Sequence, residues 1–344
     1  MHCANMRASR GGRGVERSVK LQVPFIQLPL LFDAEALARE VLAIDEASWM
    51  PHPQGFPGNS MLPLVAIDGN PENEAFDGPM RPTPHLRACP YLGQVIASLG
   101  ATVGRSRLMR LSGQAEVTPH IDQGYYWADR VRVHVPIVTQ PTVRFECGDA
   151  AIHMAAGECW IFDTWREHCV LNDADQARIH LVVDTVGGSA FWDLVARGRA
   201  HGVPPQGDWQ PRRVSPRPGV EAEFPLESVN VPVVMSPWEM NAHFSLMFGD
   251  AIAHPQLPQL QFMAAQLIRG WRGLWAQYGT APAGQPQYKA LLDRFMAQAM
   301  PMANPIVLAN GGSFAASMSM LIHKSALHAG TQGDSGEYGP SDRA

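Results

Sequence analysis

The sequence has no uninterrupted run of eighteen apolar residues, no block of five or six like charges, and no cysteine pair in C-x-x-C spacing. The first absence argues against a transmembrane helix, and the start "MHCANMRASRGGRGVERSVK" is basic without the long apolar stretch of a signal peptide. The second argues against a nucleic-acid surface or a basic membrane anchor. Five cysteines, an odd number without metal-site spacing, argue against a disulfide framework or a structural zinc. We therefore expect a cytoplasmic protein with small-molecule or peptide partners, no nucleic acid and no membrane association; the oligomeric state stays open.

The chain does contain enough apolar character for a sizeable core, with 46% hydrophobic and 17% charged residues among 344. From Arg105 to Asp184, short strand-like runs bounded by Gly, Pro, Asn or Asp follow one another without helices, which favours an antiparallel sandwich or barrel. Beyond it, apolar residues at three- and four-residue spacings predict helices. The predicted organisation is a disordered tail at 1–18, a mainly β domain at 19–201, a Pro-rich linker at 202–234, a helical domain at 235–328, and a disordered tail at 329–344.

The stretch "VTPHIDQGYYWADRVRVHVPI" at 117–137 contains a candidate metal site. His120 and Asp122 are two residues apart, so on a strand both side chains leave the same face. His168, 46 residues beyond Asp122, is the candidate third ligand. Two histidines and one carboxylate leave positions open around an octahedral ion, which is the arrangement of non-haem Fe(II) oxygenases. The plain alternative for His120 is a polar histidine beside a turn, because H-x-D arises often by chance in a chain with 13 histidines.

Two later strands carry charged residues that alternate with apolar ones. In "ARIHLVVD" Arg178 and His180 share one face, and in "RVRVHVPI" Arg130, Arg132 and His134 share one face. A guanidinium offers a planar fork that matches a carboxylate, so Arg178 could hold the distal carboxylate of 2-oxoglutarate in an oxygenase that uses this cosubstrate. The alternative interpretation of each such residue is a solvated strand face.

Segment 107–188 resembles the aspartyl/asparaginyl β-hydroxylase family of Fe(II)/2-oxoglutarate oxygenases, and within it most closely the bacterial L-proline cis-4-hydroxylases. The motifs that carry the resemblance are "RLS" at 110–112, "PHID" at 119–122, "RVHVPI" at 132–137, Cys147, "HMAAGECWIFD" at 153–163, His168, and "ARIHLVVDTVGG" at 177–188. The members that act on Asp and Asn residues of protein domains have a small residue in place of the metal carboxylate. Because this chain keeps Asp122, it resembles the proline-hydroxylase branch more.

The resemblance implies the fold, the cofactors and a role for each site residue. The implied fold is a mainly β double-stranded β-helix (jelly-roll, cupin-like) core with flanking helices, here followed by a C-terminal α-helical appendage. His120, Asp122 and His168 would bind Fe(II) and form the catalytic centre. Arg178 would hold 2-oxoglutarate, with His134 beside its other end and Arg132 at a substrate or cosubstrate carboxylate; O2 is the remaining cosubstrate. Arg130 is a further candidate for a substrate carboxylate.

Some roles and three functions stay open from the sequence alone. Asp163 and Glu158 could accept hydrogen bonds from the ligand histidines or be ordinary strand-end charges. The favoured function is hydroxylation of an unactivated C–H bond in an amino acid, or in an amino-acid residue of a peptide. The second is hydroxylation of a protein side chain with the helical domain recruiting the target. The third is a metal-binding cupin-like barrel without catalysis.

Overall fold

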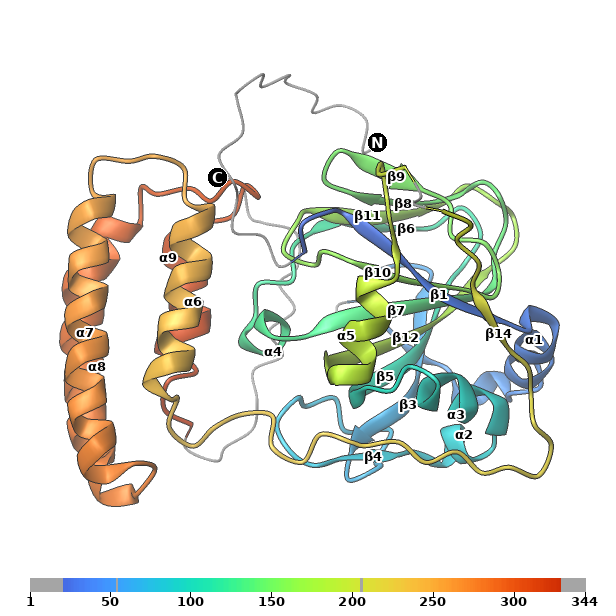
Figure 1. Cartoon of the computed structure of the whole chain (residues 1–344), viewed down its shortest axis with the longest axis horizontal. Coiled ribbons are helices and arrows are strands. Elements are labelled where there is room, and N and C mark those ends of the chain that lie inside the picture. Colours follow the sequence, from blue (N-terminus) through green and yellow to red (C-terminus); the bar gives the residue numbers. More distant parts are fainter. Residues whose placement is uncertain (1–20, 54, 205–206, 329–344) are drawn as a thin grey trace. The chain divides into compact units, whose positions relative to one another are not determined.

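The computed structural model describes residues 21–53, 55–204 and 207–328 (Figure 1). The tails expected at 1–18 and 329–344 lie outside these residues. The described chain divides into two compact units. We call residues 21–120 and 129–230 the β unit, and residues 121–128 and 231–328 the helical unit.

The larger sheet of the β unit has ten strands, and its pairs are antiparallel except for the one between β1 and β14. In spatial order they are β13 (Arg199–Ala200), β1 (Phe25–Phe32), β10 (Glu158–Phe162), β7 (Val131–Val138), β12 (Arg178–Gly187), β5 (Thr102–Leu111), β3 (Asn59–Ile67) and β2 (Met50–Pro51), with β14 (Arg212–Val214) beside β1 and β4 (Met80–Pro82) beside β3. Nearly every residue of β12 is buried. This strand has apolar residues on one face and mostly ionisable residues on the other. Because both sets are buried, other parts of the protein cover both faces.

The smaller sheet has four strands in the order β6 (Glu116–His120), β11 (His168–Asn172), β8 (Val143–Cys147) and β9 (Ala150–Ile152). Between β5 and β12 the chain passes repeatedly from one sheet to the other, so each sheet is built from strands far apart in sequence. Side chains of both sheets share one apolar core: Phe25, Leu111, Val143, Phe145, Cys147, Met154, Trp160, Phe162 and Val170. This is the arrangement of a double-stranded β-helix, and it confirms the predicted fold class.

Short helices flank the sheets of the β unit: α1 (Ala34–Leu42), the 3₁₀ turn η2 (Glu46–Ser48), α2 (Pro84–Arg87), α3 (Pro90–Ala97) and α5 (Ser189–Ala196). The helix α1 begins after Asp33, whose Oδ1 accepts a hydrogen bond from the Ala36 amide at 2.9 Å. Its buried residues Ala36, Leu37 and Val41 lie at helical spacing on one face.

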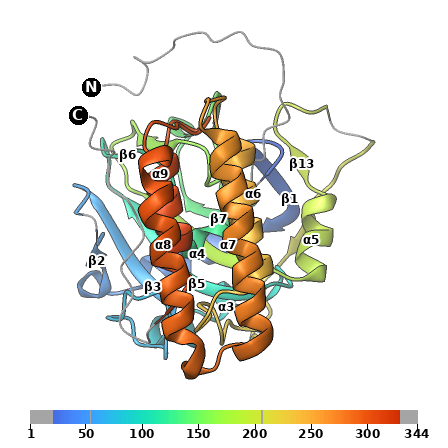
Figure 2. The ribbon, with the colours of Figure 1, turned by 90° about the vertical axis from the view of Figure 1, so that its left-hand side faces the viewer.

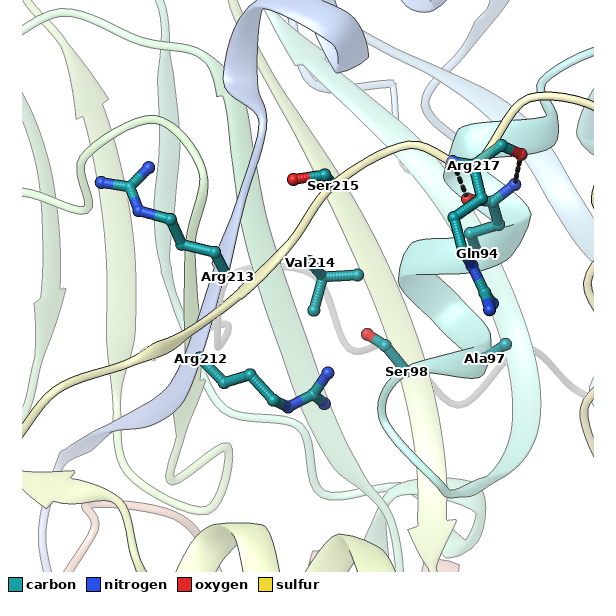
Figure 3. Close-up of a pocket in the computed structure, with 8 residues that line it drawn as sticks. All are labelled: Gln94, Ala97, Ser98, Arg212, Arg213, Val214, Ser215 and Arg217. Carbon is teal, nitrogen blue, oxygen red and sulfur yellow. Dashed lines mark hydrogen bonds between the residues drawn. The ribbon is translucent and has the colours of Figure 1, made fainter.

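The sequence predicts a Pro-rich linker at 202–234. In the structure, the described residues of this segment up to Asn230 group with the β unit. Strand β14 pairs with β1, and Leu226 forms a bridge with Val103. The side chain of Gln94 on α3 donates to the Arg217 carbonyl at 2.8 Å and accepts from its amide at 2.8 Å (Figure 3). Proline and glycine prevent a long regular element here, yet several amides and carbonyls of the segment pair with the sheet and α3.

A pocket of about 390 Å³ lies beside this segment. Gln94 and Ala97 of α3 line it together with Arg212, Arg213 and Arg217 (Figure 3). None of its lining residues belongs to the predicted metal or cosubstrate site. The pocket is therefore a surface feature separate from the chemistry considered below.

The helical unit consists of α4 (Tyr125–Ala128), α6 (Pro237–Asp250), α7 (Leu257–Tyr278), the 3₁₀ turn η3 (Pro282–Gly284), α8 (Gln285–Ala303), α9 (Phe314–Met318) and the π-helical turn η4 (Ser319–His323). The long helices α7 and α8 pack side by side, and α6 packs on α7 (Figure 2). The predicted C-terminal helices are confirmed. The sequence did not predict that residues 121–128 group with them. Among the described residues, no helix is long and apolar enough to cross a membrane.

A buried ion pair joins Arg130, just before β7, to Glu227 in the segment that was predicted to be a linker. Arg130 donates from Nε and Nη2 to the Glu227 carboxylate, at 2.9 Å and 2.7 Å, and both side chains are at most 5% exposed. Glu227 is also fixed by its backbone, since its amide donates to the Val103 carbonyl and its carbonyl accepts from Met80. Loss of the carboxylate alone would therefore leave the strand pairing in place and a buried guanidinium without its main counter-charge.

We expect Glu227→Ala to lower the free energy of unfolding by about 3–5 kcal/mol, the usual cost of removing one partner of a buried pair. The measurement is chemical denaturation of the full chain. A matched control is Asp173→Ala, which breaks the half-exposed pair with Arg144 and should cost about 1 kcal/mol or less. Equal costs for the two variants would contradict this account of the pair.

Candidate metal and cosubstrate site

The three predicted metal ligands come together in the structure. His120 ends β6, His168 begins β11, and the two are direct partners in the antiparallel register. Their ring centroids are 4.2 Å apart. Asp122 follows His120 by two residues, and one ligand atom from each of the three side chains lies within 4.8 Å of the others. Two imidazoles and a carboxylate at this separation can share one divalent ion.

Backbone carbonyls orient both imidazole rings. His120 Nδ1 lies 2.8 Å from the Thr118 carbonyl and His168 Nδ1 lies 2.9 Å from the Arg166 carbonyl, in each case two residues earlier in the chain. Because a carbonyl only accepts, Nδ1 carries the proton and Nε2 keeps its lone pair for a metal. Burial holds the pKa of His168 well below its usual range, and the neighbouring His120 lowers it further. The neutral form that a metal requires is thereby favoured.

Asp163 and Glu158, the two carboxylates that were candidate partners of the histidines, accept hydrogen bonds from other groups. Asp163 accepts from the Trp165 amide at 3.1 Å and from Arg166 Nε at 3.1 Å, so it orders the turn that leads into His168. Glu158 accepts from the Ala155 amide and from Trp160 Nε1, each at 2.8 Å. The rings of His120 and His168 therefore donate to the carbonyls of Thr118 and Arg166, and not to the carboxylates of Asp163 and Glu158.

Aromatic side chains surround His168 on the core side. Its ring is stacked on Phe145 with centroids 6.3 Å apart and lies 4.8 Å from the ring of Phe162. The ring of His134 contacts the same two phenylalanines at 5.2 Å and 5.4 Å. These apolar walls lower the local dielectric and so strengthen every charge interaction at the site.

Arg178, His180 and His134 form a connected polar group on the inner face of the larger sheet. Arg178 Nη2 donates to His180 Nδ1 at 2.8 Å, and His134 Nδ1 lies 3.4 Å from the same atom. Arg178 is only 4% exposed, and burial lowers its pKa to about 9, so the guanidinium still carries its charge at neutral pH. Among the described residues, no carboxylate pairs with Arg178, and its Nε has no hydrogen-bond partner.

The two other predicted arginines are already paired with carboxylates. Arg132 Nε donates to Asp184 Oδ1 at 3.2 Å, across the register between β7 and β12. The expectation that Arg130 is available for a substrate carboxylate is wrong, because its guanidinium is engaged with Glu227 at a buried site. The sequence could not indicate this pair, since 97 residues separate its members.

Two buried arginines on β5 were not among the site residues predicted from the sequence. Arg105 Nε lies 4.0 Å from Asp184 Oδ2, and Arg107 lies opposite Val182 of β12 in the sheet register. Both are buried. The signal was present in "GRSRLMRL", where these two arginines alternate with Ser106 and Leu108. Together with Arg132 and Arg178 they bring four arginines to the face that also carries the carboxylate of Asp184.

Comparisons with known proteins agree with the motifs over one part of the chain. Residues 75–187 match the family model described as aspartyl/asparaginyl beta-hydroxylase. An L-proline cis-3-hydroxylase of a Streptomyces species is 30% identical over an alignment of 141 residues that covers 38% of this chain. The chain spans 48% of the length of that relative. This relative hydroxylates carbon 3 according to its name, whereas the motifs resemble those of the cis-4 enzymes.

Two solved structures share the arrangement only loosely. A Pseudomonas putida prolyl-4-hydroxylase is 16% identical, with 47% of this chain and 92% of that chain covered and a TM-score of 0.34. An oxidoreductase of the 2OG-Fe(II) oxygenase family from Burkholderia pseudomallei is 14% identical, with 46% and 82% covered and a TM-score of 0.33. The fold assignment therefore rests on the sheet topology of the protein itself.

The buried histidines of the polar group predict a pH dependence of stability. Burial, and next the charge of Arg178, hold the pKa values of His134 and His180 well below the usual range. Above about pH 6.5 both rings are neutral whether the chain is folded or not, and their contribution to stability is fully present. Below that pH only the unfolded chain takes up protons, so stability falls as the pH falls.

When the pH is lowered from 7.5 to 5.5, we expect the free energy of unfolding to fall by about 1.4 kcal/mol for each of the two histidines. Denaturant titrations at these two pH values check this. His180→Gln keeps an acceptor for Arg178 and should reduce the loss by that amount. The same loss in wild type and variant would mean that the folded ring of His180 takes up a proton as readily as the unfolded one.

The matched segment contains β4 to β12, and with them every candidate ligand and Arg178. The sequence motifs and the family match therefore point to the same segment. The resemblance of this part of the chain to the aspartyl/asparaginyl β-hydroxylase family is thereby confirmed.

Proposed function

We propose that the protein is an Fe(II)/2-oxoglutarate-dependent dioxygenase that hydroxylates an unactivated C–H bond of an amino acid, or of an amino-acid residue in a peptide. The observation that carries the proposal is the combination of a His120, Asp122 and His168 cluster with the buried, carboxylate-free guanidinium of Arg178. Neither the metal cluster nor the buried guanidinium would indicate this function as specifically by itself. A metal cluster fits many proteins, but few need an unpaired buried cation near it.

The ligand set suits iron that must keep positions for other molecules. Two histidines and one carboxylate occupy three sites of an octahedral ion and leave the rest for cosubstrate and O2. When bound, iron with 2-oxoglutarate and O2 supplies the oxidation that converts C–H to C–OH, with succinate and CO2 as coproducts. The chain itself contributes oriented ligands, neutral imidazoles and the apolar walls formed by Phe145 and Phe162.

Arg178 suits the distal carboxylate of 2-oxoglutarate. A buried charge without a counter-charge destabilises a fold, so its presence indicates a ligand that supplies the negative charge. The hydrogen bond from Nη2 to His180 fixes one edge of the guanidinium. A carboxylate could then pair with the remaining N–H groups in a bidentate manner.

The cationic inner face supports a substrate with a carboxylate of its own. Arg105, Arg107 and Arg132 lie on this face, and the carboxylate of Asp184 lies beside Arg105 and Arg132. The planar guanidinium groups of arginines are suited to recognising the carboxylate of an amino acid. The name of the curated relative, an L-proline hydroxylase, supports the same substrate class. The four described cysteines are all free thiols, which supports a reducing, cytoplasmic location.

The two other functions are less well supported. Asp122 speaks against the branch that hydroxylates Asp and Asn side chains of proteins, because that branch has a small residue there. A binding barrel without catalysis gives no reason for the buried charge of Arg178. The oligomeric state is not part of the proposal.

The test of the cosubstrate site is anaerobic addition of Fe(II) and 2-oxoglutarate, followed by visible absorption spectroscopy. We expect a weak metal-to-ligand charge-transfer band in wild type. In Arg178→Ala, half-saturation should need at least about tenfold more 2-oxoglutarate, since a bidentate charged contact is lost. Arg144→Ala, a change at an exposed ion pair, is the control and should behave as wild type. No band in wild type despite bound iron would contradict the proposal.

The test of the metal site is His168→Ala. This change removes one of three protein ligands, so Fe(II) binding and succinate formation should be lost together. The control is His201→Ala, an exposed histidine of the β unit, which should keep both. Iron binding at wild-type affinity in His168→Ala would show that the ion is held elsewhere.

A further inference from the structure

The pocket beside α3 is lined by residues of the β unit alone, which come from α3 and its end and from segment 212–217. Its volume of about 390 Å³ is in the range of small-molecule sites. Three lining residues are arginines, Arg212, Arg213 and Arg217, and none of the described residues that line the pocket is acidic. The whole chain carries a formal charge of −5, so a basic overall composition does not account for this cluster.

The backbone that carries these arginines is held at both ends. Strand β14 pairs in parallel with β1. At the other end, the buried side chain of Gln94 donates to the Arg217 carbonyl and accepts from the Arg217 amide, each at 2.8 Å. Between these two attachments, the hydroxyl of Tyr91 donates to the Val214 carbonyl. The arginine side chains therefore start from fixed positions, which lowers the entropy cost of binding a ligand between them.

The side chains of Arg212 and Arg217 approach the end of α3 from two directions. Arg212 points toward Ser98 and Arg217 toward Ala97, whereas Arg213 leaves β14 on the opposite face (Figure 3). The split between Arg212 and Arg213 follows from the alternation of side chains along a strand. All three arginines are exposed, and they form no ion pair with any residue that the structure describes. The guanidinium groups of Arg212 and Arg217 thus keep N–H donors for a ligand.

Capping of α3 does not explain the two converging arginines. The last four carbonyls of a helix lack intrahelical partners, and cations near the C-terminus often satisfy them. In α3 these four carbonyls already accept hydrogen bonds: Gln94 from the Ser98 amide at 3.0 Å, Val95 from Ser98 Oγ at 2.7 Å, Ile96 from the Leu99 amide at 3.2 Å, and Ala97 from the Gly100 amide at 3.2 Å. The helix end is therefore complete without the guanidinium groups.

We propose that this pocket binds a phosphate group, free or as the monoester of a small molecule, and that Arg212 and Arg217 hold it. A phosphate monoester carries nearly two negative charges and three strong acceptor oxygens at neutral pH. Two guanidinium groups from different directions can each donate two hydrogen bonds to it, whereas one guanidinium is enough for a carboxylate. The site uses neither the candidate metal ligands nor Arg178, so it stands or falls independently of the proposed function.

The test is isothermal titration calorimetry of the full, metal-free chain at neutral pH and low salt with glycerol 3-phosphate and with inorganic phosphate. We expect one equivalent to bind with a dissociation constant of about 1 mM or less. Glycerate, which has a carboxylate in place of the phosphate, should bind at least about tenfold more weakly because it offers less charge and fewer acceptors. Tighter binding of the ester than of inorganic phosphate would identify an ester as the ligand, and equal binding would identify the free ion.

Four variants locate the site. Arg212→Ala and Arg217→Ala each remove one pair of donors and should raise the dissociation constant of glycerol 3-phosphate by about tenfold or more. Both side chains are exposed and the backbone contacts remain, so the fold should persist, which thermal unfolding checks. Arg87→Ala removes the same charge from an exposed arginine of α2 and should bind as wild type does. Arg178→Ala should also bind as wild type, which separates this pocket from the candidate cosubstrate site.

Three results would overturn the proposal. The first is that neither phosphate compound binds in the millimolar range. The second is wild-type affinity in both Arg212→Ala and Arg217→Ala, or a loss confined to Arg178→Ala, which would place the phosphate in the cosubstrate site. The third is an equal loss in Arg87→Ala, which would show a general attraction of anions to exposed arginines. None of these results bears on the charge-transfer band with Fe(II) and 2-oxoglutarate, so the proposed function is tested separately.

Discussion

The pairing of β6 with β11 is the constraint on which the rest of the candidate site depends. It places His120 opposite His168 and thereby sets the separation of two candidate ligands that are 48 residues apart in the chain. The strands can pair only because the chain alternates between the two sheets, which closes the smaller sheet over the core around Phe145 and Phe162. A shift of one residue in this register would turn His168 to the opposite face and separate the ligands.

The inner face of the larger sheet shows how burial and charge are balanced. Arg130 and Arg132 have carboxylate partners within the fold, through Glu227 and Asp184. Arg178 has an imidazole partner and no carboxylate among the described residues. Arg178 therefore differs from Arg130 and Arg132, and this difference is informative about ligands. The neutral state of His134 and His180 avoids additional positive charge beside it.

The helical unit changes the interpretation of the C-terminal third of the chain. From sequence it was an appendage that could recruit a target. In the structure it includes the eight residues that follow His120, and α6 provides the acceptor for Tyr125. Within this unit, side-chain contacts hold segment 121–128, which belongs to no strand.

The sequence by itself determined the local patterns and the chemistry that they allow. Alternation in "ARIHLVVD" put Arg178 and His180 on one face, and three- and four-residue spacings marked the C-terminal helices. These features depend on residues close in sequence, so periodicity reveals them. Tertiary structure decided which charges are neutralised. The pairing of Arg130 with Glu227, the placement of Arg105 beside Asp184, and the attachment of Tyr125 to Glu239 join residues about 80 to more than 100 positions apart. No local pattern encodes such partners, because they are set by the sheet register and by the packing of whole elements.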